Sequence, residues 1–117
     1  MKDFSNHFRE LVKSRLRDDP RILVPRGGQD MVILATWRLS GDAFRPHKRS
    51  RMIRIVIAQE ALESYAGATD EERRSSDARF VTWFERQLGT FDPSHDSPLG
   101  VEPPAVTWLV GPAILNC

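Results

Sequence analysis

The sequence predicts an α+β fold, with a mainly antiparallel sheet of three to four strands and an N-terminal helix and a helix pair packed on it. Extended apolar runs lie at 21–24, 31–39 and 52–58, and another follows at 105–110. Between the last two runs, two segments have helical periodicity and helix-start signals. Strands grouped first and helices grouped afterwards are typical of this class. The chain has 117 residues, which indicates a single domain, 1–117.

The N-terminal segment has the periodicity of an amphipathic helix. Its apolar positions recur at i, i+4, i+7, i+8 and i+12, namely Phe4, Phe8, Leu11, Val12 and Leu16. We expect Asp3 or Ser5 to cap its start, because a short side-chain oxygen accepts from the free amides of the first turn. Asp18-Asp19-Pro20 is expected to end it, because the residue before a proline is disfavoured in helical geometry.

The next segments are predicted to be strands. Arg21–Val24 is a short one, and Met31–Leu39 pairs with Met52–Ala58 across a long loop. Every second residue of the two long strands is expected in the core, including Ile53, Ile55 and Ile57.

The second side of both long strands is also apolar, as Leu34 and Val56 show. Antiparallel strands with one face in water alternate more cleanly than this. We therefore expect part of the second face to be covered, either by the N-terminal helix or by another subunit.

Two helices are predicted after the central strand. Gln59–Tyr65 is short, and Gly67 is expected to end it in a left-handed conformation. Thr69 and Glu72 match a capping box, in which each side chain bonds the other residue's backbone amide. The second helix should run to Leu88, before Gly89. Its buried stripe is predicted to comprise Phe80, Val81, Phe84 and Leu88.

The remaining chain alternates between irregular and extended structure. Residues 91–104 hold four prolines and are expected to be an irregular surface segment. Ala105–Val110 is the last strand, with Trp108 on its core side, and its pairing direction is left open. Ala113–Cys117 is expected to be a tail.

Four features of the chain carry a resemblance. They are the strand hairpin, the run Ile-Xaa-Ile-Ala-Gln-Glu-Ala-Leu at 55–62, the aromatic helix that follows it, and the closing Val-Thr-Trp-Leu-Val-Gly-Pro at 106–112. Together they resemble small bacterial proteins of unknown function. The resemblance implies a bacterial cytoplasmic protein and carries over no catalytic or binding residue.

Composition agrees with a cytoplasmic location. The only cysteine is Cys117, so no internal disulfide is expected. The first 20 residues hold no unbroken apolar run, which argues against a signal peptide. The apolar run Met31–Ala35 is far shorter than the roughly 20 residues of a membrane span.

Charge is distributed unevenly although the formal net charge is only +1. Residues 1–57 carry 13 Lys and Arg against 6 Asp and Glu, whereas residues 58–117 carry 4 against 10. Either the two halves interleave in the fold and cancel locally, or one surface is basic.

No catalytic, cofactor or metal signature stands out. His7, His47 and His95 lie in separate segments without metal-ligand spacing, and each is interpreted as a surface histidine. We expect no cofactor and favour a protein without enzymatic activity. The features that indicate binding are a basic group and Trp83, which lies either at the core periphery or in an interface. The basic group, a candidate for anion or nucleic-acid contact, comprises Arg45, Lys48, Arg49, Arg51 and Arg54.

Two functions follow from these features. The first is a non-enzymatic domain that acts by protein contact with an unknown partner or with itself. As a homodimer, the basic part of one copy would meet the acidic helices of another. The alternative is a nucleic-acid-binding module that uses the basic loop at 45–54.

Overall fold

The structure of this chain is a computed structural model that describes residues 4–25, 28–39, 49–93 and 105–115. These residues form an α+β fold, as predicted. The strands are β1 (Arg21–Leu23), β2 (Met31–Thr36), β3 (Ile53–Ile57) and β4 (Val106–Val110), and the helices are α1 (Ser5–Lys13), α2 (Gln59–Ala66), α3 (Asp70–Thr90) and α4 (Pro112–Leu115).

The strands form one mixed sheet in the order β1-β2-β3-β4. The first two pairings are antiparallel, and β3 pairs with β4 in parallel. In the central register, Ile55 lies opposite Ile33 on one side and Trp108 on the other. The parallel pairing follows from the connection, because α2 and α3 carry the chain back to the end of the sheet where β3 began.

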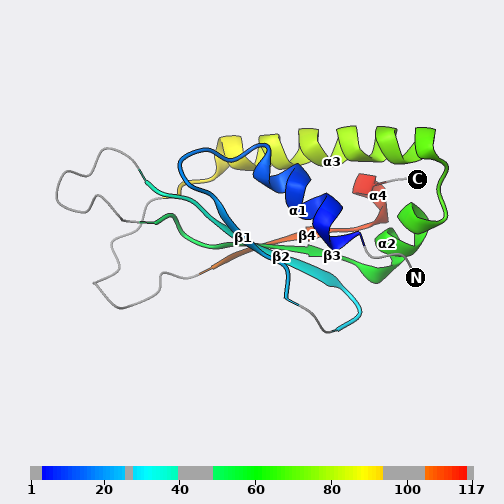
Figure 1. Ribbon diagram of the computed structural model, residues 1–117, viewed down its shortest axis with the longest axis horizontal. Helices are drawn as coiled ribbons and strands as arrows, with labels where there is room; N and C mark the ends of the chain where they lie inside the picture. Colours follow the sequence, from blue (N-terminus) through cyan, green and yellow to red (C-terminus); the bar gives the residue numbers. More distant parts are fainter. Residues whose placement is uncertain (1–3, 26–27, 40–48, 94–104, 116–117) are drawn as a thin grey trace.

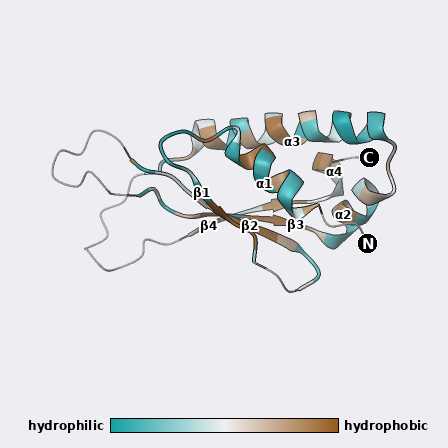
Figure 2. Cartoon of the chain, viewed as in Figure 1, coloured by the Kyte–Doolittle hydropathy of each residue, from teal (hydrophilic) through white to brown (hydrophobic). Residues whose placement is uncertain are grey.

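The helices gather on one side of the sheet and enclose the core (Figure 1). Ile33, Ile53, Ile55 and Ile57 are 0% exposed, so the predicted core face of the central strands is confirmed. The helices contribute Phe8 and Val12 from α1, and Phe80 and Phe84 from α3, to the same cluster. Figure 2 shows the strands mostly toward the hydrophobic end of the scale. Because α1 packs on this side, it is not the cover expected for the second face.

The start of α3 agrees with the sequence. The Glu72 amide donates to Thr69 Oγ1 at 3.2 Å, and the Thr69 amide donates to Glu72 Oε1 at 3.0 Å, so the capping box is present. The end of α3 differs from the prediction, because Gly89 lies inside the helix. Phe91 follows the last helical residue, and its ring packs against Trp37 and Trp108.

Other helix ends also differ from the predictions. α1 begins after Phe4, and Ser5 lies inside the helix rather than capping it. Gly67 keeps a φ of −86° instead of a left-handed one, and its amide donates to the Glu63 carbonyl as in a helical turn. The predicted C-terminal tail begins as α4, which places Leu115 in the core.

β2 is shorter than predicted and ends at Thr36. Beyond it, the Trp37 amide donates to Ser50 Oγ at 3.1 Å and the Trp37 carbonyl accepts from the Ser50 amide at 2.8 Å. Pairing then continues as an isolated antiparallel bridge between Arg38 and Arg49. Within the described ranges, no helix combines the length and the apolar character needed to cross a membrane.

Candidate functional site

The sheet has a side that faces away from the described helices (Figure 1). Successive side chains of a strand point to opposite sides, so every second strand residue belongs to it. We call this side the open face. Its strand residues are Arg21, Leu23, Val32, Leu34, Thr36, Arg54, Val56, Thr107 and Leu109.

Aliphatic residues cross the open face from one edge strand to the other. Leu34 lies opposite Leu23, and Val56 lies opposite both Val32 and Leu109. Leu23 is 66% exposed and Leu109 is 71% exposed, and none of the five belongs to the core cluster. We call them the apolar stripe. A contiguous exposed apolar surface is typical of a contact site.

Basic side chains line a hollow at the end of the open face where β1 and β3 begin. The hollow has a volume of about 350 Å³, and we call it the arginine hollow. It is lined by Arg21, Thr36, Arg49, Ser50, Met52, Arg54 and Ala105. The Arg21 side chain is 71% exposed and lies 3.9 Å from Asp19 Oδ2. Arg54 is exposed, and its side chain forms no hydrogen bond or ion pair with any residue that the structure describes.

Arg49 is held more firmly than the other arginines of this hollow. Its Nη1 donates to Asp19 Oδ2 at 3.1 Å, and its Nη2 donates to the Asp19 carbonyl at 2.8 Å. The same Nη2 lies 3.1 Å from the Thr36 carbonyl, and the Arg49 side chain is 22% exposed. Arg49 is therefore fixed in place with its charge offset by Asp19, while Arg21 and Arg54 remain more accessible.

The predicted basic group is split by the fold. Arg49 and Arg54 line the arginine hollow, whereas Arg45 and Lys48 lie outside the described residues. The Arg51 guanidinium carbon lies 5.8 Å from the centroid of the Phe91 ring. Arg51 precedes β3 and does not line the arginine hollow.

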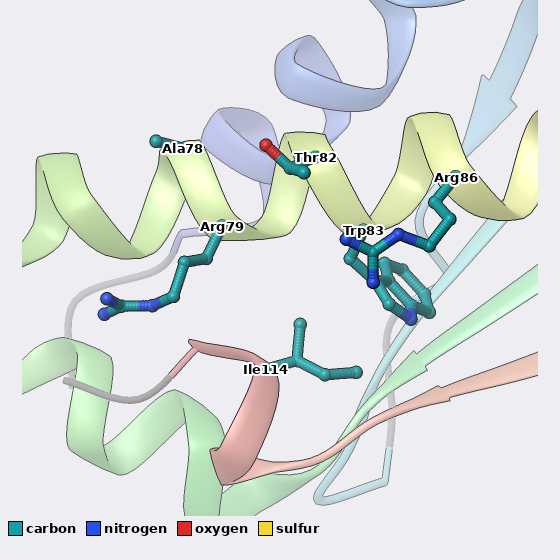
Figure 3. Close-up of a pocket in the computed structure, with 6 residues that line it drawn as sticks. All are labelled: Ala78, Arg79, Thr82, Trp83, Arg86 and Ile114. Atoms are coloured by element: carbon teal, nitrogen blue, oxygen red, sulfur yellow. The ribbon is translucent and has the colours of Figure 1, made fainter.

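Trp83 lies at the periphery of the core. Its ring centroid is 5.7 Å from that of Phe80 and 6.2 Å from that of Trp108. It also lines a hollow of about 370 Å³ between α3 and α4, where Arg79 and Arg86 extend from α3 on either side of Ile114 (Figure 3). Arg79 Nη2 donates to the Leu115 carbonyl at 3.0 Å. These contacts give Trp83 a packing role, and its predicted interface role stays a prediction.

A cluster of polar side chains connects three helices. The buried Tyr65 hydroxyl donates to Asp77 Oδ1 at 2.9 Å and lies 2.9 Å from His7 Nε2. His7 Nε2 lies 3.0 Å from Asp77 Oδ2. His7 is exposed, as expected, but its bonds to α2 and α3 were not foreseen from sequence, because Tyr65 is 58 residues away. The cluster joins α1 to the helix pair.

Sequence reasoning also missed Arg21 and Asp19 as neighbours of Arg49. The alternation of charged and apolar residues in Arg21–Leu23 indicated that one side of β1 is exposed. The pairing of Arg21 with Thr36, however, depends on how β1 and β2 meet in the fold. No group of three or more His, Cys, Asp or Glu side chains within the described ranges is arranged to hold a metal ion.

Comparison of the chain with protein-family models, curated proteins and solved structures gives no match. The resemblance to small bacterial proteins therefore stays a prediction.

Proposed function

We propose that this chain is a non-enzymatic protein-contact domain that binds its partner through the open face. The observation that carries the proposal is the apolar stripe, whose end residues Leu23 and Leu109 are 66% and 71% exposed. Burial of apolar surface contributes roughly 25 cal/mol per Å² removed from water. The described helices leave this stripe of aliphatic side chains uncovered, so a partner protein that packs on it would remove apolar surface from water.

Site-specific photo-crosslinking in native cells tests this proposal. A photoreactive amino acid at position 109 is expected to give one discrete adduct, whose crosslinked peptides map to one segment of one protein. The same label at Thr82, exposed on α3, is the matched control and should give none. Substitution Leu34→Glu in the stripe should abolish the adduct. No adduct at position 109, or equal adducts at both positions, would refute the proposal.

A second function, nucleic-acid binding, is favoured by the accessible guanidiniums of Arg21 and Arg54 in the arginine hollow. Two phosphate contacts on a duplex would give a slope of roughly −2 in a plot of log binding constant against log salt concentration. The open-face strand residues include no aromatic side chain on which a base could stack, which favours the protein partner. Titration of a random-sequence duplex between 50 and 200 mM salt is the test, and loss of binding in Arg54→Glu would support this second function.

A further inference from the structure

The charges on the open face lie on one side of the apolar stripe. Arg21 precedes Leu23 by two residues in β1, and Arg54 precedes Val56 by two residues in β3. Both strands run antiparallel to β2 and therefore run in the same direction. Both arginines consequently lie toward the arginine hollow, and the stripe has one basic flank.

No acidic residue belongs to β1, β2, β3 or β4, the strands that the structure describes. A partner that covers the stripe also takes water from the neighbouring Arg54. An interfacial charge that loses its water without gaining a partner weakens binding. The carboxylates nearest these strands are already engaged, Asp19 by Arg21 and Arg49 and Asp30 by the Gln59 amide. The partner therefore supplies the negative charge that Arg54 lacks.

From this asymmetry we infer that the open face binds a different protein, through a segment with aliphatic side chains along one edge and carboxylates along the other. The inference rests on the proposed function and names the chemistry of the partner.

A second copy of this chain fits the face poorly. Among the described residues, the exposed large hydrophobic side chains are Leu23 and Leu109, which both lie on the open face. Within the part of the chain that the structure describes, another copy therefore offers an aliphatic stripe only on its own open face. That pairing would bury Arg54 of each copy against strands that hold no carboxylate.

The dimensions of the stripe suit a short helical segment. The stripe runs from β1 to β4, which are three strand spacings apart, and each spacing is about 4.8 Å. The resulting length of roughly 14 Å corresponds to about ten residues of helix at 1.5 Å per residue. An amphipathic helix with Asp or Glu on one flank presents both required chemistries at once.

Peptide titration with the full chain tests the inference. The probes are labelled amphipathic peptides with the same leucine face and with Glu, Gln or Lys on one flank. We expect the Glu peptide to bind about tenfold more tightly than the Gln peptide at low salt, and the Lys peptide to bind most weakly. In the double variant Arg21→Glu with Arg54→Glu, the order of Glu and Lys peptides should reverse.

The control variant combines Arg9→Glu with Arg74→Glu, which makes the same change in charge at exposed positions on α1 and α3. It should keep the wild-type order of binding. All of these substitutions are at exposed positions. Far-ultraviolet circular dichroism is the check that each variant is folded.

The outcomes separate the inference from the proposed function. Equal binding of the three peptides would overturn the acidic partner but leave an apolar contact face. Absence of binding by all three would overturn the inference, and the crosslinking at position 109 would then decide on the contact face independently. Concentration-dependent dimerisation that Leu109→Asp abolishes would show a second copy on the face and overturn the inference. Binding of an oligonucleotide, without binding of any of the three peptides, would also overturn the inference.

Discussion

Arg49 and Asp19 are joined by two hydrogen bonds, one to the carboxylate (3.1 Å) and one to the backbone carbonyl (2.8 Å). Asp19 lies in the turn between α1 and β1, where Asp18 and Asp19 have left-handed φ values of 65° and 58°. Such a conformation is unfavourable for residues other than glycine, although aspartate tolerates it better than most. Arg49 therefore fixes a strained turn to the end of β2 and positions one wall of the arginine hollow.

Arg49→Lys should destabilise the protein by roughly 2–3 kcal/mol, because an ammonium group cannot reach the Asp19 carboxylate and carbonyl together. The free energy of unfolding from urea titration is the measurement. Arg74→Lys, at an exposed position on α3, should change this free energy by less than about 0.5 kcal/mol. Equal effects of the two substitutions would contradict the role given to Arg49.

Substitutions at Asp18 test the strain in the turn. Asp18→Gly should leave stability unchanged or raise it by up to about 1 kcal/mol, because glycine adopts a φ of 65° without steric cost. Asp18→Val should lower stability by roughly 1–2 kcal/mol, because a branched side chain clashes in this conformation. The difference between the two variants in urea unfolding measures the strain, and a difference near zero would argue against it.

Ser76 carries a buried hydroxyl that has no hydrogen-bond partner among the described residues. Replacing it with alanine removes an unsatisfied polar atom from the core and keeps the helix propensity of α3 high. Ser76→Ala should therefore stabilise the protein by about 1 kcal/mol in thermal or urea unfolding. A loss of stability would mean that the hydroxyl is satisfied in solution.

The capping box formed by Thr69 and Glu72 should make the stability of the protein depend on pH. The hydrogen bonds from the Thr69 backbone amide and from its side chain lower the pKa of Glu72 from 4.5, the ordinary value. A carboxyl group whose pKa is lower in the folded state contributes stability above its unfolded pKa and loses it as the pH falls through the folded value. Thr69→Ala should cost about 1 kcal/mol at pH 7 and less at acidic pH.

Urea unfolding of the wild type and of Thr69→Ala at pH 7 and at acidic pH measures this dependence. Glu72→Gln keeps a hydrogen-bond acceptor at the same position but does not titrate, so it is the matched control. Its difference from the wild type should shrink as the pH falls, and a constant difference would rule out the titration of Glu72.

A comparison of substitutions at Leu109 and Ile55 distinguishes the contact surface from the folded core. Ile55→Ala should cost roughly 2–5 kcal/mol, because the isoleucine is 0% exposed and its removal leaves a cavity. Leu109→Ala should change stability by less than about 0.5 kcal/mol, because the leucine is 71% exposed. Comparable losses for both would show that Leu109 belongs to the folded core rather than to a contact face.

Local patterns in the sequence were enough to identify most of the elements. Alternation in β3 placed Ile53, Ile55 and Ile57 in the core, and the pair Thr69 and Glu72 marked the start of α3. These features depend on residues within a few positions of each other, so the chain's own periodicity and capping chemistry specify them. The same patterns did not give the end of α3, where the packing of Phe91 matters more than Gly89.

The tertiary structure alone decided which side of the sheet the helices cover and which charges meet. Both sides of β2 and β3 are apolar in sequence, and the path of α1 and α3 determines that Leu34 and Val56 are left on the open face. Arg49 bonds to Asp19, which is 30 residues away in the sequence. This contact gives Arg49 a structural role that Arg54 does not have. Such pairings depend on how the chain returns to the sheet, and local propensity carries no information about that path.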